Sequence, residues 1–172
     1  FESYSREYAR PALQRGLKFE QELGTNPFKF GMIGSTDSHT GLATADSDNF
    51  FGKFPGSEPA AERLSNQMGG FAWKNRTLAA SGYAAVWAEE NTRESIFDAL
   101  ARKEVYATTG PRITVRFFGG WNYDETILDD PNMIEEAYSL GVPMGGNLTN
   151  QENTQATPSF LISAIKDPSG AN

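Results

Sequence analysis

The predicted fold class rests on one stretch of the chain, "FKFGMIGSTDSHTG" at residues 28–41. Residues 28–35 form a short, mostly apolar run that ends in a glycine and a serine, a pattern typical of a buried strand. The polar residues 36–41 follow at the C-terminal end of that strand, where α/β folds place their catalytic and binding residues. The stretch therefore predicts an α/β fold whose catalytic or binding residues lie within residues 36–41.

Asp37 and His39 are the candidate metal ligands and catalytic residues of this stretch, and His39 is the only histidine of the chain. Side chains two residues apart on an extended segment project to the same side, and an Asp–His pair suits Zn, Mn or Fe. A polar turn, with Asp37 accepting from nearby amides and His39 exposed, explains the same spacing. Catalytic metal sites usually have at least three protein ligands, so the others would be carboxylates or residues outside this sequence.

Composition excludes several classes of protein. The chain has 172 residues, long enough for one core or for a core with an appendage. Its net charge of −7 argues against a nucleic-acid-binding surface. Since it contains no cysteine, disulfides, thiolate zinc sites and a cysteine nucleophile are excluded. No apolar run approaches the length that spans a membrane.

Helices and strands are also predicted on either side of the central stretch. A helix is expected over residues 11–23. Residues 83–88 predict a strand that leads into a helix capped by Asn91 or Thr92. The sequence "VYATTGPRITVRFFGG", residues 105–120, predicts a turn followed by a strand with apolar alternation.

The distribution of residue types predicts a long loop and a domain boundary. Residues 41–82 are rich in Gly, Ser, Ala and Asn without clear periodicity, which predicts a loop that is either functional or disordered. The sequence becomes acidic and then β-rich after a boundary near 118–122, so we expect an α/β part over 1–120 and a small β-rich appendage over 121–172. Because the chain does not begin with Met and stops just after a predicted strand, we expect a piece of a larger protein.

Three motifs carry a resemblance to a known family: "NPFKFGMIGSTDSHTGL" at 26–42, "SGYAAVWAEENTRESIFDALARKEVYATTGPRITVRFFGGW" at 81–121, and "GVPMGGNL" at 141–148. Together they resemble a bacterial family of large proteins of unknown function. That family is similar to the PHP (polymerase and histidinol phosphatase) superfamily of metal-dependent phosphoesterases. The resemblance covers most of residues 10–170 and keeps the motifs in order.

The resemblance implies a fold and a metal centre. PHP-type proteins have a distorted (β/α)7 barrel with two or three metal ions at the C-terminal ends of the strands. Their last ligand motif is Gly/Ser-x-Asp-x-His, which Asp37 and His39 match. The early His-x-His motif and the middle histidine and glutamate ligands have no counterpart here. Residues 1–120 would then be the C-terminal portion of the barrel, and the metal site of this piece alone would be incomplete and inactive.

Three further residues are candidates for binding a small anionic substrate. Lys53 lies among aromatic residues of the long loop, which can act as a lid or as a plain surface excursion. Glu89 follows a predicted strand and can serve as a ligand, a general base or a partner of an imidazole, or can simply complement a helix N-terminus. Arg112 can contact a substrate oxygen or anchor the Gly-Pro turn that precedes it.

The sequence thus supports two hypotheses about function. The first is a metal-dependent hydrolase in which divalent ions activate water against a phosphoester or a related ester or amide. The second is a binding or structural module that keeps the barrel without turnover. Small anionic molecules are the expected partners, and neither nucleic acid nor a membrane span is expected.

Overall fold

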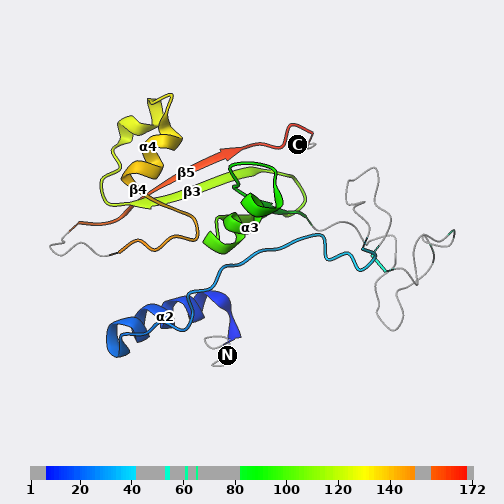
Figure 1. Ribbon diagram of the computed structural model, residues 1–172, viewed down its shortest axis with the longest axis horizontal. Helices are drawn as coiled ribbons and strands as arrows, with labels where there is room; N and C mark the ends of the chain where they lie inside the picture. Colours follow the sequence, from blue (N-terminus) through cyan, green and yellow to red (C-terminus); the bar gives the residue numbers. More distant parts are fainter. Residues whose placement is uncertain are drawn as a thin grey trace. The chain divides into compact units, whose positions relative to one another are not determined.

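The structure, a computed structural model, describes residues 7–41, 53–54, 61, 65, 82–149 and 156–169 (Figure 1). The chain divides into two compact units, Phe1–Gly31 and Met32–Asn172. In the described residues, the first unit contains one α-helix, and the second contains short antiparallel strands with further helices. The chain is therefore a mixed α/β protein, which confirms the predicted class at this coarse level.

The first unit is built around helix α2 (Ala9–Leu23), which confirms the helix expected over residues 11–23 and begins two residues earlier. The helix ends at Gly24, whose backbone is left-handed with φ of 70° and whose N–H donates to the carbonyl of Glu20 at 3.0 Å. Glycine adopts this conformation without steric cost, which explains the position of the helix end.

The second unit begins, in its regular structure, with a β–α–β segment. Strand β1 (Ala84–Val86) pairs antiparallel with β2 (Val105–Ala107), and helix α3 (Arg93–Arg102) connects them. The hydroxyl of Thr92 accepts from the N–H of Ser95 at 3.3 Å and caps α3, as one of the two predicted capping residues. Antiparallel pairing across this helix differs from a parallel βαβ unit, in which a crossover helix joins parallel strands.

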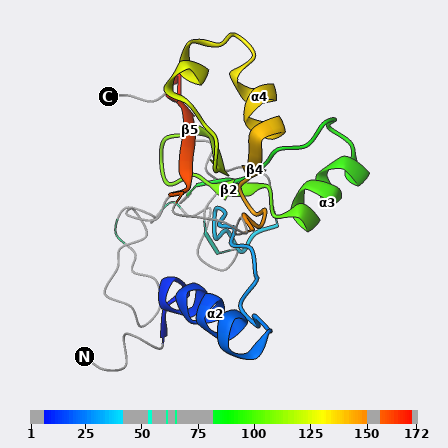
Figure 2. The ribbon, with the colours of Figure 1, turned by 90° about the vertical axis from the view of Figure 1, so that its left-hand side faces the viewer.

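A three-stranded antiparallel sheet forms the centre of this unit, with β3 (Thr114–Gly120) between β4 (Gly141–Pro143) and β5 (Ser159–Ile165). Figure 2 shows helix α4 (Met133–Leu140) beside this sheet. The 3-10 helix η2 (Glu125–Asp129) and α4 contribute to a core with β3 and β5. The buried apolar residues of this core are Phe118, Ile127, Ala137 and Leu161. The sheet draws strands from both sides of the boundary predicted near 118–122.

Strand pairing decides which face of β3 is buried. Phe118 lies opposite Leu161 on the face that packs against α4, and Phe117 lies opposite Ile162 on the other face. The predicted alternation along residues 113–117 is present, but this face is the exposed one, with Phe117 38% and Ile162 62% exposed. Because adjacent residues 117 and 118 are both phenylalanine, the sequence pattern did not identify the core face.

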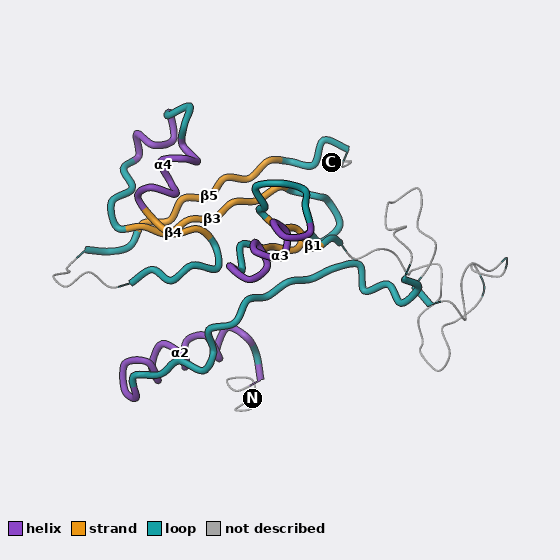
Figure 3. Tube along the Cα trace, viewed as in Figure 1, coloured by secondary structure: helices purple, strands orange, loops and turns teal. Residues whose placement is uncertain are grey.

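Residues 28–35 do not form the predicted buried strand. Figure 3 shows the segment after α2 as loop, and Phe30, Met32 and Ile33 are 42%, 56% and 50% exposed. The physical reason is that a buried barrel strand needs hydrogen-bonded strands beside it, and no described strand pairs with this segment. The described ranges contain two small antiparallel sheets and no closed barrel. Most of the loop predicted over 41–82 lies outside the described residues.

The turn after β4 is tightly packed against the end of α3, and Gly145 makes this contact possible. Gly145 has φ of 83°, and a Cβ built there would lie 2.3 Å from the carbonyl oxygen of Lys103. That neighbour is backbone, so it cannot move aside as a flexible side chain would. We expect Gly145→Ala to lower the free energy of unfolding by about 2–4 kcal/mol, because overpacking adds to the strain of a positive φ.

Chemical denaturation monitored by circular dichroism measures this loss. Gly110→Ala is the matched control, since Gly110 also has a positive φ of 73° but open space around its Cβ position. Gly110→Ala should lower the free energy of unfolding less than Gly145→Ala does, because it adds the strain of a positive φ without overpacking. Equal losses for the two variants would mean that the turn does not press on the end of α3.

Candidate functional sites

Asp37 and His39 lie together on the loop that follows Met32, within the second unit. Asp37 has φ of 54°, a left-handed conformation that aspartate tolerates better than most residues. The oxygen Oδ1 of Asp37 lies 3.5 Å from Nε2 of His39, and the imidazole ring packs against Phe54 with centroids 4.5 Å apart. The side chains of Asp37 and His39 are 66% and 52% exposed, so both are accessible to solvent ions.

Lys53 completes this cluster. Its backbone carbonyl accepts from the N–H of His39 at 2.8 Å, and its ammonium group donates to Oδ2 of Asp37. Hydrogen bonding from Lys53, followed by its positive charge, lowers the pKa of the Asp37 carboxyl below its ordinary value. Asp37 is therefore anionic at neutral pH, and a lysine cation already accompanies one of its oxygens.

The Asp37–His39 pair fits part of a metal centre. Two ligand atoms that bind one tetrahedral Zn²⁺ at its usual bond lengths stand about 3.3–3.5 Å apart, and the observed separation of Oδ1 and Nε2 is 3.5 Å. Among the described residues no group of three His, Cys, Asp or Glu side chains can hold a metal ion. The donors present thus suit a divalent metal in kind and spacing but supply two ligands.

Lys53→Met is expected to raise the pKa of the Asp37 carboxyl toward its ordinary value of 3.8, because the variant removes both the hydrogen bond and the charge. A pH titration of the carboxyl carbon by NMR measures the change. Since the pKa in the folded protein is lowered, this interaction stabilises the fold above the unfolded-state pKa and is lost as the pH falls through the folded-state pKa.

Lys18→Met serves as the control for that titration, because Lys18 pairs with Glu22 on α2 and not with Asp37. The Asp37 titration should be unchanged in this variant. If Lys53→Met also left it unchanged, the Lys53–Asp37 contact would not be present in solution.

The structure places the other two predicted substrate-binding residues in different surroundings. The backbone N–H of Arg112 donates to the buried carboxylate of Asp167 at 2.7 Å, and its guanidinium lies 4.2 Å from the ring centroid of Tyr83. These contacts are those of an anchored turn, and a substrate contact by Arg112 stays a prediction. Glu89 is exposed and lines a pocket to which neither Asp37 nor His39 contributes.

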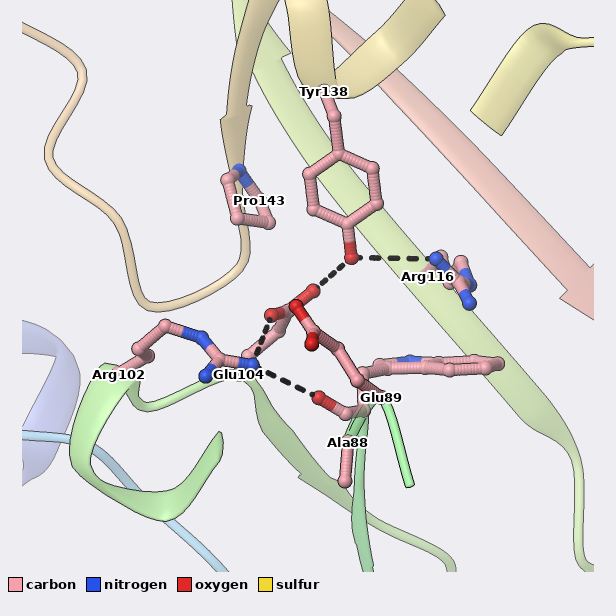
Figure 4. Close-up of a pocket in the computed structure, with 8 residues that line it drawn as sticks. Ala88, Glu89, Arg102, Glu104, Arg116, Tyr138 and Pro143 are labelled. Atoms are coloured by element: carbon pink, nitrogen blue, oxygen red, sulfur yellow. Dashed lines mark hydrogen bonds and ion pairs between the residues drawn. The ribbon is translucent and has the colours of Figure 1, made fainter. Parts of the chain in front are cut away.

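This pocket has a volume of about 590 Å³ and is lined by the segment that follows β1, by the C-terminal end of α3, and by β3, α4 and β4 (Figure 4). Such a volume lies within the range of small-molecule sites. We call it the Glu104 pocket. The polar, charged and aromatic side chains at its wall are those of Trp87, Glu89, Arg102, Glu104, Arg116 and Tyr138.

Glu104 is the buried charge at the centre of the pocket wall, with 4% of its surface exposed. Its Oε1 accepts from the hydroxyl of Tyr138, and its Oε2 accepts from Nη2 of Arg102 at 3.4 Å. Burial, followed by the hydrogen bond with Glu104, raises the pKa of Tyr138 to about 12. Each carboxylate oxygen of Glu104 therefore has a partner, as a buried anion requires.

Arg116 extends this network on the opposite side of Tyr138. Its Nη1 donates to the Tyr138 hydroxyl oxygen at 3.3 Å (Figure 4). Its guanidinium carbon lies 3.6 Å from the ring centroid of Trp87. The indole N–H of Trp87 donates in turn to the carbonyl of Val115 at 2.8 Å, which fixes the ring. The result is a chain of donors from Arg116 through Tyr138 to Glu104.

Of the residues at this pocket, sequence reasoning named Glu89 alone as a candidate. One signal was available: Arg116 interrupts the apolar strand "TVRFF" two residues before Phe118, and side chains two apart on a strand share a face. A cation on the core face of a strand needs a special environment. The partners Trp87, Glu104 and Tyr138 come from distant parts of the sequence, and no local spacing relates them.

Tyr138→Phe is expected to lower the free energy of unfolding by about 1–3 kcal/mol at neutral pH, because the buried Glu104 loses a hydrogen-bond donor. The difference from the unmodified protein should shrink as the pH rises from the ordinary tyrosine pKa of 10.0 towards about 12. In that interval the unfolded chain ionises its tyrosine while the folded protein keeps Tyr138 protonated. Denaturant titrations at several pH values measure both effects.

Tyr106→Phe provides the comparison, since Tyr106 stands next to Trp87 with ring centroids 6.5 Å apart but has no hydroxyl hydrogen bond within the described residues. It should change stability little at any of these pH values. A loss in Tyr106→Phe as large as that in Tyr138→Phe would contradict the role given to the Glu104 contact.

Comparison with known proteins gives one match. A family model described as "Protein of unknown function (DUF3604)" matches residues 2–172. No curated protein and no solved structure matches the chain. No helix among the described residues is long and apolar enough to cross a membrane.

Proposed function

The chain belongs to the DUF3604 family, and we propose that it contributes Asp37 and His39 to the divalent-metal centre of a hydrolase. The substrate would be a phosphoester or a related small anionic ester or amide. The observation that carries the proposal is the 3.5 Å separation of Oδ1 of Asp37 and Nε2 of His39, which matches two ligands of one Zn²⁺. Mn and Fe, which also accept carboxylate and imidazole ligands, are the alternatives to Zn.

Asp37, His39 and Lys53 would each have a separate role at such a metal centre. Asp37 supplies an anionic oxygen, kept ionised by its lowered pKa. The backbone of His39 is held by the carbonyl of Lys53, and its ring is held by Phe54. Lys53 brings a cation to the same place, where it can meet an anionic oxygen of the substrate. A bound divalent ion would acidify water and polarise the ester.

The proposal also includes the fold of the complete domain, a PHP-like barrel. The resemblance of three sequence motifs to PHP-type proteins supports a distorted (β/α)7 barrel, completed by ligands beyond this chain. The described residues supply two ligands, so the piece alone should bind metal weakly. Arg112 and Glu89 are the further residues proposed to contact substrate on the basis of sequence.

A second candidate function is a binding or structural module without turnover. The observation in its favour is that the ammonium of Lys53 already lies against Asp37, where it neutralises the carboxylate as a metal ion would. In that case Asp37, His39 and Lys53 form a polar cluster that stabilises a loop.

Metal binding by the longest natural form of the protein separates the two candidates. We expect Zn²⁺ or Mn²⁺ to bind, Asp37→Ala and His39→Ala each to weaken that binding by more than about tenfold, and a phosphoester or sulfoester substrate to be hydrolysed. Isothermal titration and elemental analysis measure the metal, independently of activity. Asp98→Ala, an exposed carboxylate on α3, is the control that should leave the metal content unchanged.

The hydrolase proposal fails if Asp37→Ala leaves the metal content unchanged and no member of a phosphoester and sulfoester panel is hydrolysed. Metal binding that depends on Asp37 and His39 without turnover of any panel member would instead support the binding module.

A further inference from the structure

We propose that the Glu104 pocket is a second binding site, which takes a small organic ligand through an anionic, oxygen-bearing group paired with Arg116. The ligand group is a phosphate, a sulfate or a carboxylate, since all three present the oxygens that a guanidinium binds. The proposal does not depend on Asp37, His39 or a metal ion, because none of these residues lines the pocket.

Among the described residues, no carboxylate pairs with the guanidinium of Arg116. Glu104 is satisfied by Arg102 and by the Tyr138 hydroxyl. Within the part of the chain that the structure describes, the guanidinium of Arg116 donates to a neutral oxygen, that of Tyr138, and otherwise contacts aromatic rings. A half-buried cation that faces a cavity and pairs with no described carboxylate is the natural partner of an incoming anion.

The unused hydrogen-bond donors of Arg116 also favour binding of an anion. A guanidinium has five N–H donors, and among the described residues the guanidinium of Arg116 makes one hydrogen bond, through Nη1. Stacking on Trp87 covers a face of the group but uses none of the donors, which lie in its plane. The remaining donors can therefore bind a second planar or tetrahedral anion, with the orientation already fixed by Trp87 and Tyr138.

The rim of the pocket limits the charge of the ligand. Glu89 is exposed at the wall and has no ion pair within the described residues. Its carboxylate repels additional negative charge and can accept from a hydroxyl or amine of the ligand body. Trp87 and Pro143 supply apolar wall for that body. A singly charged group on a small polar molecule fits this pattern better than a polyanion.

Titration of the protein with inorganic phosphate, sulfate or acetate, each at constant ionic strength, tests the proposal. The readout is the indole N–H resonance of Trp87, assigned with Trp87→Phe, because the guanidinium of Arg116 lies over the Trp87 ring and the N–H donates to the carbonyl of Val115. We expect saturable shifts with at least one of the three anions. The strongest of the three identifies whether phosphate, sulfate or carboxylate is the preferred group.

Two pairs of variants give effects of opposite sign. Arg116→Met should weaken anion binding by about tenfold or more, whereas Arg93→Met removes an exposed arginine of α3 outside the pocket and should leave it unchanged. Glu89→Gln should strengthen binding about two- to fivefold, whereas Glu90→Gln, exposed but not in the pocket wall, should not. Arg116→Lys keeps the charge without the planar fork and should bind at an intermediate level.

Circular dichroism of each variant establishes that it folds. If Arg116→Met does not fold, the test of anion binding rests on Arg116→Lys and the two glutamate variants, because each of them keeps a cation at the pocket. The absence of saturable shifts with all three anions would overturn the proposal, and so would equal effects of Glu89→Gln and Glu90→Gln. Neither result would bear on metal binding by Asp37 and His39.

Discussion

The buried carboxylate of Glu104 is the constraint on which the second unit depends. Glu104 follows the left-handed C-cap of α3, its N–H donates to Ala99, and its carbonyl accepts from Trp87 at the end of β1. A buried carboxylate is tolerated only with hydrogen-bond partners, and these come from Arg102 of α3 and Tyr138 of α4. The requirement to neutralise this one charge therefore connects the β1–α3–β2 segment to the helix that covers the central sheet.

The same contact gives the pocket its chemistry. Tyr138 packs edge-to-face on Phe118 of the core, with ring centroids 4.9 Å apart, so its hydroxyl is held where Glu104 and Arg116 can both reach it. Because the Tyr138 hydroxyl donates its hydrogen bond to Glu104, its oxygen has a lone pair free to accept from Arg116. The orientation of Arg116 toward the cavity thus follows from packing in the core and from the charge of Glu104.

The two candidate sites are different kinds of arrangement. Asp37, His39 and Lys53 lie outside helices and strands, and among the described residues one backbone hydrogen bond, from His39 to Lys53, connects them. The Glu104 pocket is held by a helix cap, a central strand and a core helix. Rigid elements position side chains more precisely than loops do, so the fold itself fixes the side chains at the pocket wall. The Asp37–His39 pair has the chemistry of metal ligands but needs further ligands to act as a metal centre.

Local sequence determined the elements whose formation depends on neighbouring residues. The helix that ends at Gly24, the cap at Thr92 and the strand over residues 114–120 follow from glycine freedom, side-chain capping and apolar alternation. Asp37 and His39 also lie close together, but Asp37 is left-handed, so the extended geometry expected from their spacing does not explain the contact. Tertiary structure alone decided that residues 28–35 pair with no described strand, that Phe118 rather than Phe117 faces the core, and that Glu104, Arg116 and Tyr138 meet. These outcomes depend on long-range pairing and on neutralisation of a buried charge, which no local pattern encodes.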